Sequence, residues 1–464
     1  MRRTKIVCTL GPASSPARVL KRLIPLVDVF RINFSHGDRE SHLSYISEIR
    51  KEAVRAQRTV AILQDLPGPK IRVGKMAHGS ADLTRGTQFL LTASPVVGDS
   101  RHASVNYPDL LHSVEKGDLL HLADGVIRLR VEGTSGGGVL CTVLAGGTLS
   151  SGKGVNAPGV RMKVDYPTRA DTAHLRFGLR KGVDFVAASF VRTAADLKAL
   201  RRLMPEEGPS LIAKIEKMEA VQNFDEILVE ADGIMVARGD LGIEVPIQTV
   251  PTIQKQIIRK SSKAGKPVIV ATQMLVSMVN FPVPTRAEVT DVSTAIIDGT
   301  DAVMLSDETT IGRYPVEAVK MLDKIARATE MSPESVVRPE AESKTRDTAE
   351  AIGRAACRLA DYVGAKAIVA PTQTGSTARR VAMSRPVQPI IAMCTDPRVA
   401  RKMRIFRGVV PVVSHRAKTV DWLFARADLV ASRLGLAKSG DRIVVTSGTP
   451  GMKGTTNLIR VSVV

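Results

Sequence analysis

Short apolar runs alternate with helix-forming segments along most of this chain, and that rhythm restricts the fold more than any other feature. The expected strands are residues 5–10, 27–34, 59–65, 183–189, 211–216, 233–237, 267–272 and 302–306. The expected helices between them include residues 41–56, 194–204, 249–264, 287–298 and 316–328. Strands joined by helical crossovers in this number predict an α/β fold, the (β/α)₈ or TIM barrel. A doubly wound sheet is the competing interpretation, but no G-x-G-x-x-G turn follows the first strand.

Two regions depart from this rhythm and divide the chain. Glycine-rich, Thr/Val-rich segments at residues 71–162 predict an all-β lid domain inserted after the third barrel strand, mobile over the carboxyl ends of the strands. The barrel would then comprise residues 1–70 and 163–332. A polar stretch at 333–347 resembles a linker, and residues 345–464 predict a separate C-terminal α/β domain. Its expected elements are helices at 348–362 and 377–384 and strands at 367–370, 389–393, 443–446 and 458–464.

The charge balance is strongly basic and narrows the classes of partner. The chain carries 66 Lys and Arg against 46 Asp and Glu, a net charge of +20. Such a charge attracts polyanions in general, including nucleic acid and phosphorylated metabolites. The basic residues are dispersed, however, and aromatic residues make up only 3%, which leaves few platforms for stacking bases. A phosphometabolite enzyme therefore explains the composition better than a dedicated nucleic-acid-binding protein.

Apolar runs and cysteines point to a cytoplasmic protein. No run approaches the roughly 18 apolar residues of a membrane-spanning helix, and no signal or transit peptide is expected. The four cysteines lack C-x-x-C spacing, so neither a zinc site nor a disulfide framework is predicted.

Charged and polar side chains gather at the carboxyl ends of the expected strands, where barrels of this type carry their active sites. Lys214 and Glu216 lie two residues apart and share one face of a strand, and Asp240 follows the next strand in a glycine-flanked turn. One cation and two carboxylates suit a Mg²⁺ ion that holds an anionic, phosphorylated substrate. A structural ion network is the alternative. The other strand ends contribute Arg31, Asn33, Ser35, His36, Asp65, Lys70, Arg72, Gly239, Thr272, Ser306 and Glu308.

These strand ends belong to longer motifs: RINFSHG at 31–37, LQDLPGPKIR at 63–72, AKIE at 213–216, DGIMVARGDLG at 232–242, ATQML at 271–275 and PTRAEVTD at 284–291. In content, order and spacing they resemble the pyruvate kinase family over essentially the full length of the chain. The resemblance implies a barrel, an inserted β lid, a C-terminal effector domain and a homotetramer. It also implies transfer of a phosphoryl group from phosphoenolpyruvate to ADP, giving pyruvate and ATP.

The resemblance assigns roles residue by residue. Glu216 and Asp240 would hold Mg²⁺, with Mn²⁺ as a substitute. Lys214, Arg31 and Thr272 would be catalytic, the first two facing the phosphoryl group and Thr272 lying near the enolate face that is protonated. The implied substrate-binding set is Arg31, Lys214, Gly239, Asp240 and Thr272. The implied nucleotide-binding set is Asn33, Ser35, His36, Arg72 and, from the lid, Lys153.

A second interpretation is a Mg²⁺-dependent aldolase or lyase built on a pyruvate-binding barrel. Such an enzyme also uses an acidic metal pair, but it leaves the insertion and the motifs at 31–37 and 65–72 without a role.

The monovalent-cation pocket departs from the family pattern. Potassium-dependent members resemble Asp-Thr-Lys-Gly-Pro-Glu-Ile-Arg-Thr where this chain has DLPGPKIRV at 65–73, with Lys70 in place of the glutamate. Asn33, Ser35 and Asp65 remain as oxygen donors. The Lys70 ammonium would supply the charge that K⁺ otherwise gives, so K⁺ is not expected to be required. The alternative is that Lys70 points to solvent and K⁺ still binds.

The run TQTGST at 372–377 precedes an expected helix in the C-terminal domain and resembles the family's effector phosphate loop. The candidate residues are Thr372, Thr374, Gly375, Ser376 and Thr377, with the turn at 454–457 beside them. A simple helix cap without a ligand fits the same residues. No clear match follows Trp422 for an arginine that would grip a second phosphate, so a monophosphate effector, a sugar phosphate or AMP, is expected.

Overall fold

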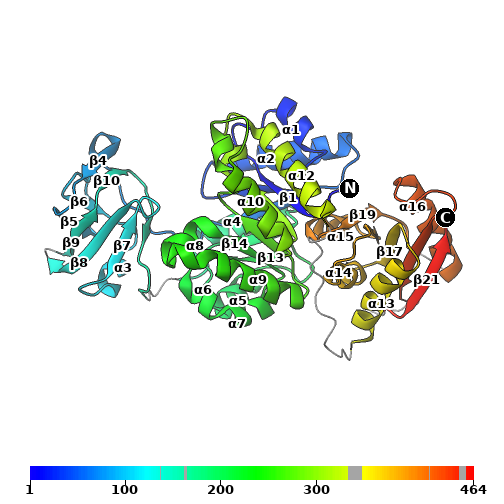
Figure 1. Cartoon of the computed structure of the whole chain (residues 1–464). Helices are drawn as coiled ribbons and strands as arrows, with labels where there is room; N and C mark the ends of the chain where they lie inside the picture. Colours follow the sequence, from blue (N-terminus) through cyan, green and yellow to red (C-terminus); the bar gives the residue numbers. More distant parts are fainter. Residues whose placement is uncertain (136, 161–164, 333–346, 417–418, 449–455) are drawn as a thin grey trace.

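The computed structural model describes residues 1–135, 137–160, 165–332, 347–416, 419–448 and 456–464. Three regions lie in a row, with the inserted β region at one end, a barrel in the middle and the C-terminal domain at the other end (Figure 1). The barrel is closed, in the strand order β1-β16-β15-β14-β13-β12-β3-β2, and its strand pairs are parallel. The predicted (β/α)₈ barrel is confirmed. Because β1 pairs with both β2 and β16, the doubly wound sheet, which would have two free edges, is excluded.

The expected barrel strands are all present, with ends that differ by at most two residues, as for 27–34 against Val29–Asn33. The strands are β1 Lys5–Thr9, β2 Val29–Asn33, β3 Ala61–Asp65, β12 Phe185–Ala188, β13 Ser210–Ile215, β14 Gly233–Ala237, β15 Val268–Ala271 and β16 Ala302–Leu305. The barrel-side helices are α1 Ala17–Leu23, α2 Arg39–Arg55, α4 Arg169–Lys181, α5 Ala194–Arg201, α6 Met218–Gln222, α7 Phe224–Glu230, α8 Arg238–Glu244, α9 Val250–Lys263, α10 Arg286–Ile297, α11 Asp307–Thr310 and α12 Pro315–Met331.

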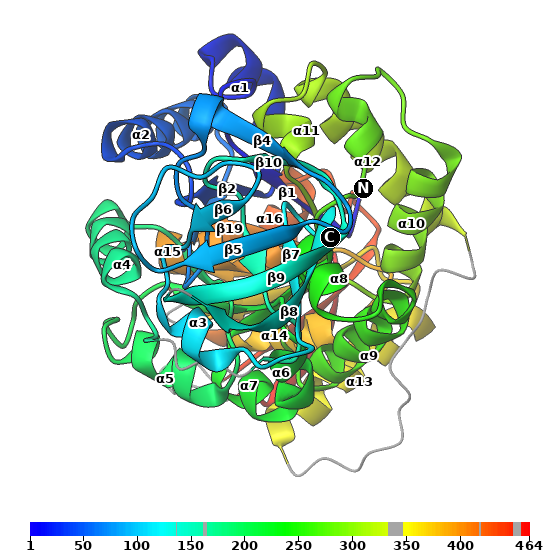
Figure 2. The same ribbon diagram turned by 90° about the vertical axis from the view of Figure 1, so that its left-hand side faces the viewer.

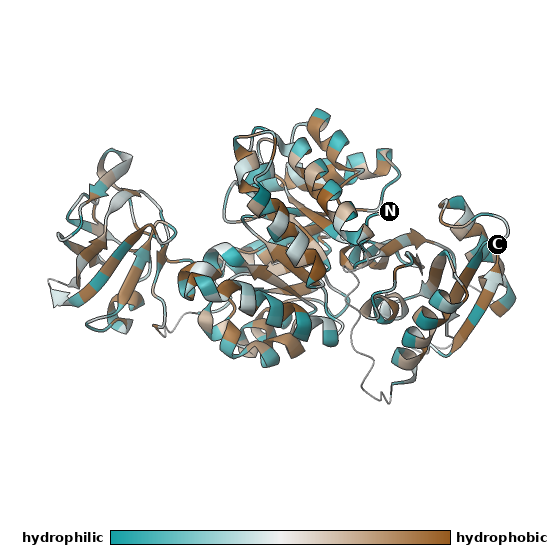
Figure 3. Cartoon of the chain, viewed as in Figure 1, coloured by the Kyte–Doolittle hydropathy of each residue, from teal (hydrophilic) through white to brown (hydrophobic). Residues whose placement is uncertain are grey.

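Hydrophobic residues concentrate in the strands, which are mostly brown in Figure 3, whereas the surrounding helices alternate between teal and brown. Successive strand residues point alternately to the helix layer and to the barrel interior. Val7, Val29, Leu63 and Ile212 belong to the fully buried interior set. Two residues further along the same strands stand Thr9, Arg31, Asp65 and Lys214. The apolar interior therefore changes into a polar layer at the carboxyl end of the barrel.

The inserted β region forms a six-stranded sheet, in the order β11-β7-β8-β9-β5-β6, and a separate pair β10-β4 around its own apolar core. Its elements are β4 Ser80–Leu83, β5 Gln88–Thr92, β6 His102–Ser104, α3 Asp109–Ser113, β7 Leu119–Leu122, β8 Ile127–Ser135, β9 Gly138–Ala145, β10 Gly147–Ser150 and β11 Val155–Asn156. The short helix α3 and a 3₁₀ turn at Ala77–Gly79 depart from the expected all-β content. When the molecule is turned by 90°, this region lies in front of the barrel (Figure 2).

The C-terminal domain is a five-stranded sheet in the order β19-β18-β17-β20-β21, in which only β21 is antiparallel. Its elements are α13 Thr348–Tyr362, β17 Ala367–Thr372, α14 Ser376–Met383, β18 Ile390–Cys394, α15 Pro397–Lys402, β19 Val409–Val413, α16 Val420–Arg433, β20 Arg442–Ser447 and β21 Leu458–Val463. The expectations missed β19, whose Pro411 is tolerated because the strand lies at the edge of the sheet. Most of the expected linker, residues 333–346, lies outside the described residues.

The C-terminal domain packs against the amino ends of the barrel strands through buried ion pairs. Three aspartates, each directly before a barrel strand, accept arginines from the C-terminal domain. The pairs are Asp28 with Arg404 at 2.6 Å, Asp184 with Arg401 at 2.6 Å and Asp301 with Arg385 at 3.4 Å. Each aspartate also accepts a backbone N–H from a neighbouring strand, from Ile6, Ile62 and Val268 respectively. The barrel floor is thus built from both regions.

Lys5 lies in the same interface, almost fully buried. Its Nζ donates to the carbonyl oxygen of Val409 at 2.7 Å and is 3.9 Å from Asp28, whose carboxylate also pairs with Arg2 and Arg404. Burial lowers the pKa of Lys5 to about 7, despite the Asp28 carboxylate. The Lys5 amine is therefore a titratable group between the barrel and the C-terminal domain.

Candidate active site

Lys214 is the centre of a buried polar cluster at the carboxyl end of the barrel. Its Nζ lies 2.8 Å from Oε1 of Glu216, 3.2 Å from Oδ1 of Asp65 and 2.7 Å from Oγ of Ser189, to which it donates. Arg31 completes the cluster, since its Nε donates to Oδ2 of Asp65 at 2.7 Å. The structure thus brings together residues from β2, β3 and β13 that sequence reasoning placed at one end of the barrel.

The charged groups in this cluster shift one another's pKa values. Burial opposes the charge on Asp65, but the Lys214 ammonium and the Arg31 guanidinium outweigh it and lower the pKa of Asp65. Burial likewise opposes the charge on Lys214, but Asp65 and Glu216 outweigh it and raise the pKa of Lys214. The cluster therefore presents a permanent ammonium and a guanidinium toward the barrel mouth, which suits a multiply charged anion.

Glu216 has capacity left for a metal ion. Its Oε2 accepts the backbone N–H of Phe190 at 2.6 Å, whereas its buried Oε1 accepts no well-aligned hydrogen bond although Lys214 is near. Burial, with the Asp240 carboxylate adding to it, raises the pKa of Glu216 despite the Lys214 ammonium. A nearby divalent cation would relieve both features.

Glu216 and Asp240 provide two carboxylates for such an ion. Within the described ranges no group of three or more His, Cys, Asp or Glu side chains is arranged to hold a metal. A hard cation at this pair would therefore take its other oxygen ligands from substrate and water, as Mg²⁺ commonly does at phosphate-transferring sites.

Helix α8 places Gly239 and Asp240 beside the end of β15. The backbone N–H of Gly239 donates to Oγ1 of Thr272 at 2.8 Å, and the same hydroxyl donates to the carbonyl of Ala271 at 2.6 Å. Thr272 has a φ of 69°, in the left-handed region that β-branched residues avoid. Such an outlier is held by its surroundings and is frequent at functional sites.

The side chain of Lys70 is directed toward Asp240 rather than away from the site. Its Nζ lies 3.4 Å from Oδ1 of Asp240 and 5.8 Å from the centre of the Phe190 ring. In the expected cation pocket, Oδ1 of Asn33 accepts the backbone N–H of Ser35 at 3.0 Å. The Lys70 ammonium thus stands beside a proposed metal ligand.

The residues expected to contact nucleotide lie at and just after the end of β2 and at both ends of the inserted β region, where Arg72 precedes β4 and Lys153 lies between β10 and β11. Burial and the charges of Arg72, Lys70 and Arg31 lower the pKa of the exposed His36, so its imidazole favours the neutral form. Arg72 donates from Nη1 to the carbonyl of Gly152 at 2.9 Å, and the neighbouring Lys153 is exposed. The exposed ammonium of Lys153 is therefore available on the insertion side of the site, whereas Arg72 is held by the carbonyl of Gly152.

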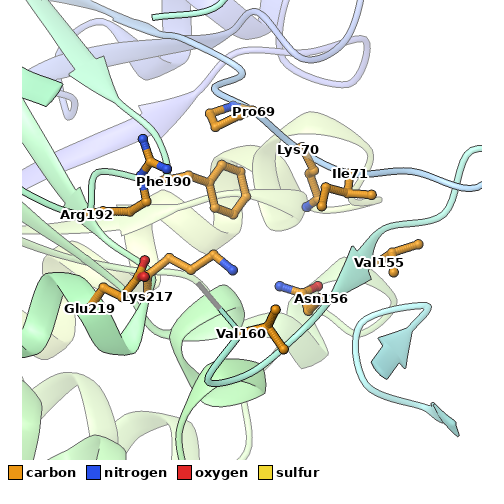
Figure 4. A pocket seen from close by; sticks show the side chains of 10 residues that line it. All are labelled: Pro69, Lys70, Ile71, Val155, Asn156, Val160, Phe190, Arg192, Lys217 and Glu219. Carbon is orange, nitrogen blue, oxygen red and sulfur yellow. The ribbon is translucent and has the colours of Figure 1, made fainter. Parts of the chain in front are cut away.

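A pocket open to solvent, with about 490 Å³ of empty space when the open solvent is included, lies between the barrel mouth and the inserted β region (Figure 4). Its lining includes Lys70, Phe190, Arg192, Lys217 and Asn156. In Figure 4, Lys217 and Asn156 point toward one another from the barrel and the insertion. The pocket thus connects the cluster around Asp240 with the base of the insertion.

Sequence reasoning missed two hydroxyls of the polar layer. Ser189 follows β12, and its Oγ donates to Asp65 at 3.1 Å while accepting from Lys214. Thr9 ends β1, and its Oγ1 accepts from Arg31 at 3.0 Å. The strand ends examined in the sequence omitted the first and fourth strands. Applying the same alternation to those two strands would have identified both hydroxyls.

Glu308 was expected in the polar cluster around Lys214, but its carboxylate binds backbone N–H groups instead. Its carboxylate accepts the backbone N–H groups of Leu275 and Ser306, at 3.0 and 2.7 Å, and so fixes the loop after β15. Burial raises the pKa of this carboxyl. Its neighbour Asp307 is exposed.

The loop of the expected effector site precedes α14. Gly375 has a φ of 89° and donates its N–H to Oγ1 of Thr372 at 2.9 Å, while Thr374 accepts the N–H of Ser376 at 3.4 Å. Thr377 shares a hydrogen bond of 2.9 Å with Thr456. Residues 454–455 of the neighbouring turn lie outside the described residues.

Comparisons with known proteins agree with this architecture. Residues 1–319 match the family model "Pyruvate kinase, barrel domain", and residues 350–462 match "Pyruvate kinase, alpha/beta domain". The chain is 46% identical over 473 residues to a pyruvate kinase of Geobacillus stearothermophilus, covering 100% of this chain and 80% of that protein. It is 43% identical over 473 residues to one of Sporosarcina psychrophila and 45% identical over 471 residues to pyruvate kinase 2 of Synechocystis, covering all of this chain and 81% and 79% of those proteins. In the described residues no helix is both long and apolar enough to cross a membrane.

Proposed function

The chain belongs to the pyruvate kinase family and is a phosphotransferase, and we propose that it moves a phosphoryl group from phosphoenolpyruvate to ADP at the Lys214 cluster. The observation that carries the proposal is the buried Lys214 ammonium, bracketed by Asp65 and Glu216 with Arg31 beside it. That arrangement offers a fixed positive charge to a phosphoryl group while the neighbouring carboxylates keep the charge in place.

In the reaction the bond between phosphorus and the enol oxygen breaks, and phosphorus bonds to a terminal oxygen of ADP. The enolate then takes a proton at its methylene carbon and becomes pyruvate. Phosphoryl transfer passes through a loose transition state, so catalysis is mainly positioning and charge stabilisation. Lys214 and Arg31 face the transferred group, and their pairing with Asp65 holds both side chains in position before substrate arrives.

Glu216 and Asp240 are the residues that would hold Mg²⁺ or Mn²⁺. When bound there, the metal would offset negative charge on substrate oxygens. The Gly239 N–H, now donated to Thr272, would be available to a substrate carboxylate once the Thr272 hydroxyl turns away. Thr272 would then lie beside the enolate that is protonated. His36, Arg72, Lys153, Asn33 and Ser35 would hold the nucleotide.

Lys70 supports activity without K⁺. Its ammonium is directed at Asp240 and lies within the charged site, so the positive charge of a monovalent cation is already supplied by the chain.

Regulation and assembly form the remaining part of the proposal. The hydroxyls and N–H groups at the start of α14 would receive a monophosphate effector, and the protein would assemble as a homotetramer. Activation by ribose 5-phosphate or AMP, compared with fructose 1,6-bisphosphate, tests the first point, and a response to the bisphosphate alone would refute it. Sedimentation velocity tests the second.

The experiment that tests the reaction is pyruvate release from phosphoenolpyruvate and ADP, with Mg²⁺ present and K⁺ excluded. We expect turnover that rises little when K⁺ is added. Rescue only by K⁺ would keep the reaction and reject the role of Lys70. No turnover under either condition, with the candidate effectors present, would reject the reaction itself.

A further inference from the structure

A single buried carboxylate, that of Glu244, joins the inserted β region to the barrel. Its Oε1 accepts Nδ2 of Asn156, from β11 of the insertion, at 3.0 Å and pairs with Nζ of Lys217 at 2.8 Å. Glu244 and Asn156 are each only 7% exposed. Hydrogen bonds to a charged group are stronger than neutral ones, and removal from water strengthens them further. The contact between insertion and barrel is therefore firm at this point.

Glu244 is linked to both proposed metal ligands, to Asp240 through α8 and to Glu216 through Lys217. It is the last residue of α8, whose first turn carries Asp240. Residues four apart on a helix lie one above the other on the same face, so α8 directly relates the two carboxylates. Its partner Lys217 immediately follows Glu216. Any shift of Glu244 is thus passed on to the backbone that holds Asp240 and Glu216.

A second hydrogen bond attaches the insertion to α8, next to Glu244. Asn156 is the cross-strand partner of His121 in the β11–β7 pair, and Nδ1 of His121 lies 3.2 Å from the carbonyl oxygen of Ile243. Because a carbonyl only accepts, Nδ1 carries the hydrogen. Burial and the Arg128 charge lower the pKa of His121, although its hydrogen bond to Ile243 opposes the shift. The neutral imidazole is sufficient to donate this hydrogen bond. Paired residues of the insertion thus contact adjacent residues of α8.

We propose that Glu244 is a positioning residue for the phosphoryl-transfer reaction, an inference that rests on the proposed function. The Glu244 carboxylate fixes the insertion onto the end of α8 and, through Lys217 and α8, sets the separation of Glu216 and Asp240. It contacts neither substrate nor metal. The pocket lined by Asn156, Lys217 and Lys70 lies beside this attachment, so loosening the attachment changes the space around Lys70, whose ammonium faces Asp240 (Figure 4).

The test uses the full-length protein with Glu244→Ala, Glu244→Gln and Asn156→Ala. Outer-shell partners of metal ligands typically contribute about 10–100-fold to metal affinity or activity, so we expect losses of that size in kcat for Glu244→Ala. The Gln variant keeps an acceptor and should recover part of the loss. The Asn156→Ala, Glu244→Ala double variant should lose no more kcat than Glu244→Ala alone, because both substitutions remove the same hydrogen bond between Asn156 and Glu244.

Two readouts are independent of turnover. Free Mn²⁺, followed by electron paramagnetic resonance, should show weaker binding to Glu244→Ala, and hydrogen exchange should rise in residues 119–122 and 155–156. The matched control is Glu132→Ala, because that carboxylate pairs with Arg130 and Thr142 inside the insertion and does not contact α8.

The outcomes separate this inference from the function on which it rests. A wild-type protein without phosphoryl transfer rejects the proposed function, while weaker Mn²⁺ binding and faster exchange in the variant would still support the positioning role. An active wild type in which Glu244→Ala behaves like Glu132→Ala in kcat, Mn²⁺ binding and exchange overturns the positioning role. If Glu244→Ala does not fold, the Gln and Asn156→Ala variants decide by the same measurements.

Discussion

The ammonium of Lys70 and the carboxylate of Asp240 lie 3.4 Å apart, although 170 residues of chain separate them. The contact crosses from the segment after β3 to the first turn of α8, and so places a built-in cation beside a proposed metal ligand. Family members that carry glutamate at the position of Lys70 would place a negative charge there instead.

We therefore predict that Lys70→Glu makes activity dependent on K⁺. In the wild type, replacing tetramethylammonium by K⁺ at equal ionic strength should change kcat by less than about twofold, whereas Lys70→Glu should require K⁺ for most of its activity, because two carboxylates at one site favour a bound cation. Lys75→Glu, an exposed change of the same charge, is the control. K⁺ activation of equal size in all three proteins would contradict the prediction.

Removing one of the two proposed metal-binding carboxylates should abolish efficient turnover. For Glu216→Gln we expect kcat/KM to fall by at least about 100-fold, the upper end of what outer-shell partners contribute, since a direct ligand contributes more. The Mg²⁺ concentration at half-maximal rate should rise as well. Glu48→Gln, at a partly exposed residue paired with Lys51, should behave as wild type. An unchanged Mg²⁺ dependence in Glu216→Gln would place the metal elsewhere.

Gly68→Ala should be destabilising and should lower activity. Gly68 has a φ of 65°, and a Cβ there would lie 2.7 Å from the carbonyl oxygen of Ser189, whose hydroxyl accepts from Lys214. Left-handed strain costs about 1–2 kcal/mol, and the steric clash adds about 1–3 kcal/mol. Gly86→Ala, with a φ of 87° and open space around it, isolates the strain alone. Differential scanning calorimetry and kcat should show the larger loss at Gly68, and equal losses would exclude the clash with Ser189.

Lys5 should make stability depend on pH. Burial lowers the pKa of Lys5 to about 7 in the folded state, against about 10.4 in an unfolded chain. Between these values the unfolded state binds more protons, so the contribution of Lys5 to stability rises as pH rises from about 7 toward 10 and is flat below that window.

Lys5→Met removes this titration. The difference in melting temperature between variant and wild type should therefore change across pH 6.5–9.5, in favour of the variant at the acid end. Lys21→Met, at an exposed position on α1, should show a constant difference. A constant difference for Lys5→Met too would mean that Lys5 keeps an ordinary pKa.

The barrel was predictable because its strands are buried on both faces and read as continuous apolar runs separated by helices. The ends of those strands also located most of the Lys214 cluster, since alternation along a strand carries the interior face from Ile212 to Lys214 and then Glu216. Helix α4 was not among the expected helices, although the capping box at Thr168 and the glycine at 182 that bound it are local sequence signals.

Contacts between distant segments could not be predicted. Whether Lys70 faced solvent or Asp240 depended on how the segment after β3 leaves the barrel. The carboxylate of Glu308 was expected in the site but serves the backbone of the loop after β15. The bond from Asn156 to Glu244 depends on where the insertion sits, which no local pattern encodes.

The barrel floor has a consequence for how this protein could be divided. A cut within 333–346 looks natural in the sequence, yet it would separate Asp28, Asp184 and Asp301 from Arg404, Arg401 and Arg385. Asp28 would keep Arg2 and Asp184 would keep Arg50, whereas Asp301 would lose the guanidinium of Arg385. The Asp301–Arg385 pair is buried on both sides, and losing one partner of such a pair costs about 3–5 kcal/mol, a large part of the stability of an ordinary domain. The two pieces are therefore not interchangeable modules. A chimaera with the C-terminal domain of another protein would need arginines at the positions of Arg385, Arg401 and Arg404 as well as the same fold.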